Sequence, residues 1–150
     1  MIIERTDFTG RYSIPQNALS NTDIDSYIAK YEVAYLQDLL GVAMFEEFEA
    51  DFGLPSMPAR FSYIEDAFAY DEDTDGCIVR SEGMLEMLKG FLYFHIVRDM
   101  KYKNSITGIG VSNPEIAREV TFDEANIYGR YNDAIATYEA IQRYIDDNSD

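Results

Sequence analysis

Residues 84–97 read Met-Leu-Glu-Met-Leu-Lys-Gly-Phe-Leu-Tyr-Phe-His-Ile-Val and form the most hydrophobic stretch of the chain. Placed on a helix, these residues are apolar most of the way round, which is typical of a helix surrounded by other elements. We therefore predict a central helix from Met84 to about Lys103. Basic residues occur at its C-terminal end, where positive charge interacts favourably with the helix dipole.

A second helix is predicted on the N-terminal side of this stretch. Apolar residues recur at spacings of three and four from Ile24 to Leu40. Thr22, followed three positions later by Asp25, fits a capping box at the start. Gly41 fits the left-handed position that follows a helix. Two short helices are expected next, one built on Phe45, Phe48 and Phe52, the other running from Pro58 to Tyr70 and built on Phe61, Ile64 and Phe68.

The last helix is predicted to run to about Asp146, with Thr121 and Glu124 as its capping box. Residues 104–121 before it contain glycines and a proline and are expected to form a long loop. Residues 146–150 are an acidic tail. Residues 1–20 are expected to form an extended arm with one short strand, and such an arm often packs against a neighbouring molecule.

These elements predict a mainly α protein. We expect one helical domain spanning residues 1–150, a bundle of about four to five helices with the arm, a short strand or hairpin, and the long loop before the last helix.

The charge and composition of the chain exclude several classes of function. The chain carries 28 Asp and Glu against 12 Lys and Arg, a formal charge of −16. Such a chain repels phosphate, so specific binding to nucleic acid or to an anionic membrane is not expected. An acidic surface is still suited to a wall past which DNA slides without sticking. The longest apolar run, residues 91–97, is far too short to span a membrane.

The chain contains few side chains of the kinds that commonly act as catalytic bases or nucleophiles. His95 and Cys77 are the single histidine and the single cysteine. His95 lies between apolar neighbours on the central helix and is interpreted as a packed side chain, and Cys77 as a small buried hydrophobe. Because no base and nucleophile can be paired by motif, we do not expect an enzyme.

One motif points to a metal. Residues 71–76 read Asp-Glu-Asp-Thr-Asp-Gly, and with Glu82 they match the calcium loop of an EF-hand. The ligands would be the carboxylates of Asp71, Asp73 and Asp75, the carbonyl of Cys77 and a bidentate Glu82. The alternative is an acidic turn that leads into a short strand, Cys77-Ile78-Val79-Arg80. A calcium-binding helical adaptor is accordingly the alternative function.

A family resemblance covers roughly residues 22–146. The pattern Tyr31-Glu32-x-x-Tyr35-Leu36-x-x-Leu39-Leu40-Gly41-x-x-x-Phe45-x-x-Phe48 resembles the opening of head–tail connector or adaptor proteins of tailed bacteriophages, including crAss-like and related phages of Bacteroidetes-type hosts. Two later segments agree: Gly83-Met84-Leu85-x-x-Leu88-x-x-Phe91 is similar to their central helix, and Tyr131-Asn132-x-Ala134 to their last helix.

This resemblance implies a structural virion protein. Such proteins form rings, often twelvefold, that join the portal to other neck or tail proteins and surround the DNA channel. The implied location is the head–tail interface of the virion, and the host cytoplasm during assembly. The expected partners are copies of the same chain, the portal protein and other neck or tail proteins.

Overall fold

The computed structural model describes residues 2–14, 20–72, 76–101 and 124–148. It contains two 3-10 turns, η1 (Arg5–Asp7) and η2 (Gly10–Tyr12), followed by α1 (Asn21–Asp51), α2 (Ala59–Glu65), β1 (Phe68–Glu72), β2 (Cys77–Ser81), α3 (Met84–Lys101) and α4 (Glu124–Asp147). The predicted mainly α bundle with a hairpin is confirmed. The predicted loop at 104–121 and the cap at Thr121 lie outside the described residues.

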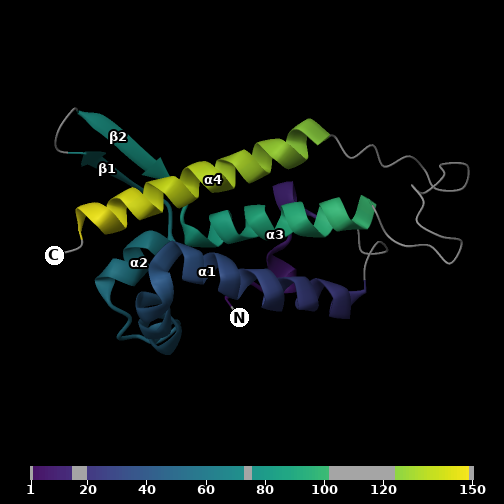
Figure 1. Cartoon of the computed structure of the whole chain (residues 1–150), viewed down its shortest axis with the longest axis horizontal. Coiled ribbons are helices and arrows are strands. Elements are labelled where there is room, and N and C mark those ends of the chain that lie inside the picture. Colours follow the sequence, from purple (N-terminus) through teal and green to yellow (C-terminus); the bar gives the residue numbers. More distant parts are fainter. Residues whose placement is uncertain (1, 15–19, 73–75, 102–123, 149–150) are drawn as a thin grey trace, which may run out of the picture.

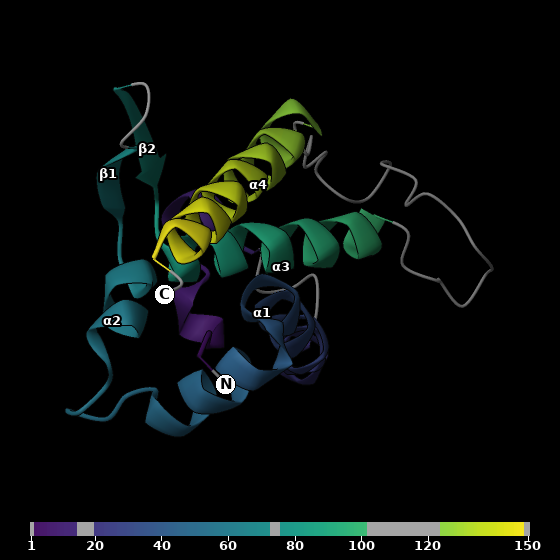
Figure 2. The same ribbon diagram turned by 60° about the vertical axis from the view of Figure 1, so that its left-hand side comes forward.

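Helix α3 occupies the centre of the bundle, as its sequence predicts. Figure 1 shows α3 between α1 and α4, and Figure 2 shows the same order from another side. Its buried side chains come from all round the helix: Met84, Met87, Leu88, Phe91, Leu92, Tyr93, Ile96 and Val97. Helices α3 and α4 approach closely, since a Cβ placed on Gly90 would lie only 2.8 Å from the Cβ of Ala134.

Helix α1 changes direction at Gly41. This residue has φ +72° and ψ +159°, a backbone conformation that side-chain-bearing residues rarely adopt. The predicted end of a helix at Gly41 is therefore confirmed, and the segment after the kink buries Phe45 and Phe48. The predicted cap is wrong by two residues. Ser20 Oγ accepts the backbone N–H of Asp23, and the Asp23 carboxylate accepts that of Ser20, both at 3.2 Å.

The predicted helix from Pro58 to Tyr70 is correct only for its first part, because α2 ends at Glu65. Residues 68–72 form β1, which pairs with β2 in antiparallel register, with Tyr70 opposite Val79. The hairpin packs through β2 against α4 at one end of the molecule (Figure 1). Phe68 is buried and Ala69 exposed, the alternation of a half-buried strand. The strand predicted at residues 77–80 is confirmed.

The N-terminal arm differs from its prediction. Residues 2–14 form the two 3-10 turns, and the described part of the arm contains no strand. Four of its side chains, Ile3, Phe8, Tyr12 and Ile14, are buried in the same core as the helices. The arm thus packs against its own chain, because its apolar residues cover the surfaces that α1 and α3 leave open.

Candidate functional site

A buried carboxylate fixes the beginning of the arm. The Glu32 side chain projects from α1 into the core and is only 3% exposed. It accepts the backbone N–H of Ile2 at 2.9 and 3.0 Å and that of Ile3 at 2.8 Å. Burying a carboxylate is costly unless hydrogen bonds compensate it, and these donors supply that compensation. Glu32 and the first residues of the arm therefore depend on each other.

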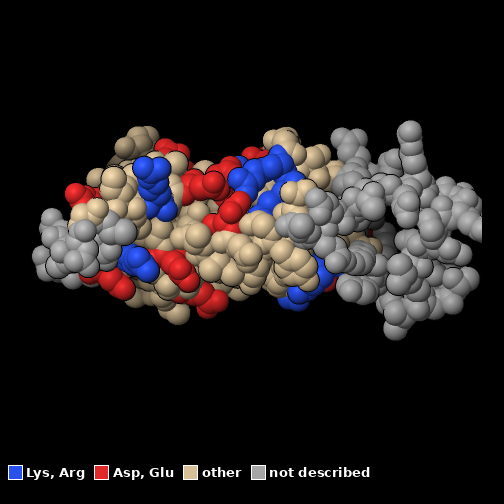
Figure 3. Space-filling view, turned by 90° about the horizontal axis from the view of Figure 1, so that it is seen from above, with Lys and Arg blue, Asp and Glu red and all other residues tan. Residues whose placement is uncertain are grey.

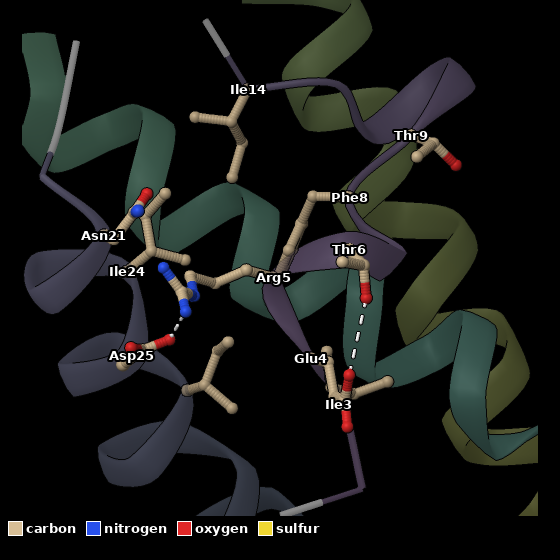
Figure 4. A pocket seen from close by; sticks show the side chains of 11 residues that line it. Ile3, Glu4, Arg5, Thr6, Phe8, Thr9, Ile14, Asn21, Ile24 and Asp25 are labelled. Atoms are coloured by element: carbon tan, nitrogen blue, oxygen red, sulfur yellow. Dashed lines mark hydrogen bonds and ion pairs between the residues drawn. The ribbon is translucent and has the colours of Figure 1, made fainter. Parts of the chain in front are cut away.

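The arm and the first turns of α1 line an open pocket of about 680 Å³. Figure 4 shows its lining, to which Ile3, Phe8 and Ile14 contribute from the arm and Ile24 from α1. Its rim is polar. Arg5 Nε lies 2.9 Å from the Asp25 carboxylate, and Thr6 Oγ1 donates to Glu4 at 3.5 Å. The lining therefore mixes apolar side chains with polar and charged ones.

The buried, hydrogen-bonded role of Glu32 was not predicted from the sequence, although its position on α1 indicates burial. Ile28, Glu32 and Leu36 follow each other at spacings of four, so the glutamate occupies an apolar stripe of α1. A charged residue in such a position requires a specific partner. The partner lies about thirty positions earlier in the chain, which no local pattern identifies.

His95 is packed, as predicted. Its Nε2 lies 2.7 Å from the hydroxyl of Tyr35, and its ring stacks on Tyr31 with centroids 3.9 Å apart. Nδ1 is buried and has no hydrogen-bond partner among the described residues. Burial, and secondarily the charge of Arg98, lowers the pKa of His95, which favours the neutral imidazole. This environment is that of a structural histidine joining α1 to α3.

The predicted calcium ligands are only partly described. Asp71 lies in β1 and is exposed, and Cys77 is the first residue of β2. Glu82 follows β2, and its carboxylate is 3.7 Å from the Arg11 guanidinium. Asp73 and Asp75 lie outside the described residues. Within the parts that the structure describes, no group of three or more His, Cys, Asp or Glu residues is placed to hold a metal ion. Calcium binding by residues 71–82 stays a prediction.

The two ends of the bundle expose large apolar side chains. At the hairpin end, Ile78 is 57% exposed and Tyr63 is 39% exposed. The Tyr63 ring stacks on Tyr144 of α4 at 4.6 Å. Near the beginning of α4, Tyr128 is 56% exposed, and its ring lies 5.8 Å from that of Phe94. We call the exposed region around Ile78 the hairpin-end surface, and Tyr128 with Phe94 the opposite-end surface.

Comparison with known proteins finds no match among family models, curated proteins or solved structures. None of the described helices is both long enough and apolar enough to cross a membrane.

Proposed function

We propose that this chain is a structural subunit of a homo-oligomeric ring, of the head–tail connector type that its sequence resembles. The observation that carries the proposal is the presence of two different exposed apolar surfaces at opposite ends of the bundle. Two different surfaces on one subunit permit head-to-tail contacts, and head-to-tail contacts between identical copies close into rings when the rotation permits.

The two surfaces are well separated. Tyr128 and Tyr144 are sixteen positions apart on α4, which corresponds to about 24 Å along the helix axis. Figure 1 shows the hairpin beside the C-terminal half of α4, well away from the beginning of that helix. The surfaces also differ in kind, since Ile78 is an aliphatic residue on a strand and Tyr128 an aromatic residue on a helix. One copy could therefore contact two neighbours at once.

The charge of the chain supports a place beside a DNA channel. With a net charge of −16, the subunit repels phosphate and lets DNA pass without holding it. Figure 3 shows the molecule from the side of α4, where acidic side chains are spread over the surface and interspersed with Lys and Arg. The proposed partners are further copies of the chain, the portal protein, and other neck or tail proteins. The proposed location is the virion neck.

A mixing experiment tests the head-to-tail arrangement. Ile78→Asp would disable the hairpin-end surface, and Tyr128→Asp the opposite-end surface, because each buries a charge in the proposed contact. Each variant alone should remain monomeric under conditions in which the unchanged chain assembles. An equimolar mixture should form dimers and no larger species. The intact hairpin-end surface of the Tyr128→Asp variant can contact the intact opposite-end surface of the Ile78→Asp variant, and no second contact is then possible. Native mass spectrometry reads out both results.

The control is Val42→Asp. Val42 is 62% exposed and follows the kink of α1, and it belongs to neither of the two surfaces. This variant should assemble like the unchanged chain. If Ile78→Asp and Tyr128→Asp assemble as well as Val42→Asp, the two surfaces are not the subunit contacts and the proposal loses its basis.

A further inference from the structure

The kink of α1 creates a second pocket, because the two segments of the helix face each other across it. Val33 and Leu36 line this pocket from before the kink, Phe48 and Phe52 line it from after the kink, and Ile2 lines it from the arm. Its volume is about 280 Å³. Sites for drug-sized ligands occupy roughly 300–1,000 Å³, so this kink pocket fits a smaller ligand or a single side chain.

Two carboxylates stand in the lining of the kink pocket. Glu32 lies before the kink and is 3% exposed, whereas Glu49 lies after the kink and is exposed to solvent. The remaining described residues of the lining are apolar. Every charge that the described lining presents to a ligand is therefore negative.

Neither carboxylate has a cationic partner in the described part of the chain. Each of α1 and α2 carries a single basic residue. Lys30 of α1 lies over the ring of Tyr31, with its ammonium 4.8 Å from the centroid, and Arg60 of α2 is paired with a carboxylate outside the pocket. The hydrogen bonds to Glu32 come from backbone N–H groups, which carry no net charge. Because buried charges in proteins are usually paired, this pocket favours a cation from outside the chain.

The lining also restricts the kind of cation. A calcium ion takes six to eight oxygen ligands, and magnesium needs a near-octahedral set, which two carboxylates among phenylalanine rings do not supply. The rings of Phe48 and Phe52, with centroids 5.3 Å apart, instead suit an apolar stem, and aromatic faces also attract an organic cation. An ionised carboxylate has about four lone-pair sites, so Glu32 retains acceptor capacity beyond its two N–H donors.

We propose that the kink pocket binds an alkylammonium group. Its carbon chain lies against the phenylalanine rings, and its ammonium is directed toward the carboxylates of Glu32 and Glu49. This site does not depend on the proposed ring, since neither the hairpin-end surface nor the opposite-end surface contributes to its lining.

Methyl NMR of the full-length chain, titrated with n-butylammonium chloride at constant ionic strength, tests the proposal. Ile2 and Val33 carry methyl groups in the lining, whereas Val42 and Ile78 carry exposed methyl groups outside it. The signals of Ile2 and Val33 should shift to saturation, and those of Val42 and Ile78 should not. The matched probe is n-butanol, which has the same chain without the charge. It should bind about tenfold more weakly, because a hydrogen bond to a charged group is the stronger one.

A pair of variants tests the role of the carboxylates. Glu49→Gln should weaken binding of n-butylammonium about two- to fivefold, as expected for an exposed ion pair. Glu46→Gln is the control, because Glu46 is exposed on the same segment and does not line the pocket. Both variants lose one negative charge, so general attraction to an acidic chain changes equally. Glu49 is changed in preference to Glu32, whose replacement also disturbs the arm.

A peptide with one lysine between glycines distinguishes the sources of the ammonium group. Shifts of Ile2 and Val33 with n-butylammonium alone identify a free amine as the ligand, and shifts with the peptide as well identify a lysine of a partner protein. The proposal is overturned if these signals do not saturate with either probe, if n-butanol binds as tightly as n-butylammonium, or if the Glu49 and Glu46 variants bind equally.

Discussion

The hydroxyl of Tyr35 in α1 lies 2.7 Å from Nε2 of His95 in α3, and the opposite ring nitrogen of the histidine is buried without a hydrogen-bond partner among the described residues. Burial raises the pKa of Tyr35 to about 12, so this hydroxyl stays protonated at neutral pH. A protonated His95 would need an acceptor for each ring nitrogen. The contact therefore stabilises the neutral imidazole.

This contact predicts a pH dependence of stability. The pKa of His95 in the folded chain is lowered by burial and by the nearby positive charges of Arg98 and Lys30, against the opposing charge of Asp99. In the unfolded chain it is about 6.5. Between these two values the unfolded chain binds more protons than the folded one, so the free energy of unfolding falls as the pH drops below about 6.5.

Urea unfolding at pH 7.5 and at pH 5.5 measures the effect. Replacing His95 by Phe keeps a ring beside Tyr31 and removes the titrating group, so the variant should lose less stability between the two pH values than the unchanged chain. Equal losses in the two proteins would show that His95 does not contribute to the pH dependence.

A second prediction concerns Glu32. Replacing it by Gln keeps its size, but it turns one of the two oxygens that accept the N–H groups of Ile2 and Ile3 into an N–H₂ donor and removes the charge that strengthens the remaining hydrogen bonds. The free energy of unfolding should fall by about 1–3 kcal/mol. Glu46→Gln, at an exposed position of the same helix, is the control and should change stability by less than about 0.5 kcal/mol. Comparable effects at the two positions would contradict the anchoring role of Glu32.

Two glycines give a matched pair of opposite predictions. Gly90→Ala places a Cβ 2.8 Å from Ala134 at the α3–α4 contact and should destabilise the chain by about 1–3 kcal/mol. Gly129→Ala, within α4 and with no atom near the added Cβ, should stabilise it by about 0.5–1 kcal/mol. Thermal unfolding measures both. If Gly90→Ala is also stabilising, the helices are not packed as closely as described.

The helices could be predicted from the sequence because the residues that determine each helix lie close together in the chain. Gly41 marks a change of direction that its left-handed conformation requires, and residues 84–97 are apolar all round because other elements surround them. Two of the failures involve residues that lie far apart in the chain. The strand at Phe68 exists because residues 77–81 pair with it, and the anchoring of the arm depends on Glu32, far along the chain. The capping error has a local cause, since Ser20 and Thr22 both begin a plausible capping box.

The calcium motif leads to a further test. The proposed connector function requires no metal, so calcium at millimolar concentration should not shift the melting temperature. A ligand that binds the folded chain raises the melting temperature, and the rise grows with the logarithm of the ratio of ligand concentration to Kd. A shift that disappears in Asp71→Asn, at the first position of the motif, would show that the motif binds calcium and would favour the alternative function of a calcium-binding adaptor.

The most direct test of the central claim is electron microscopy of the full-length chain mixed with the portal protein encoded by the same genome. The account predicts closed rings of this chain seated on the portal, with a central opening wide enough for double-stranded DNA. A chain that stays monomeric with the portal present, across the range of concentrations used for assembly, would contradict it.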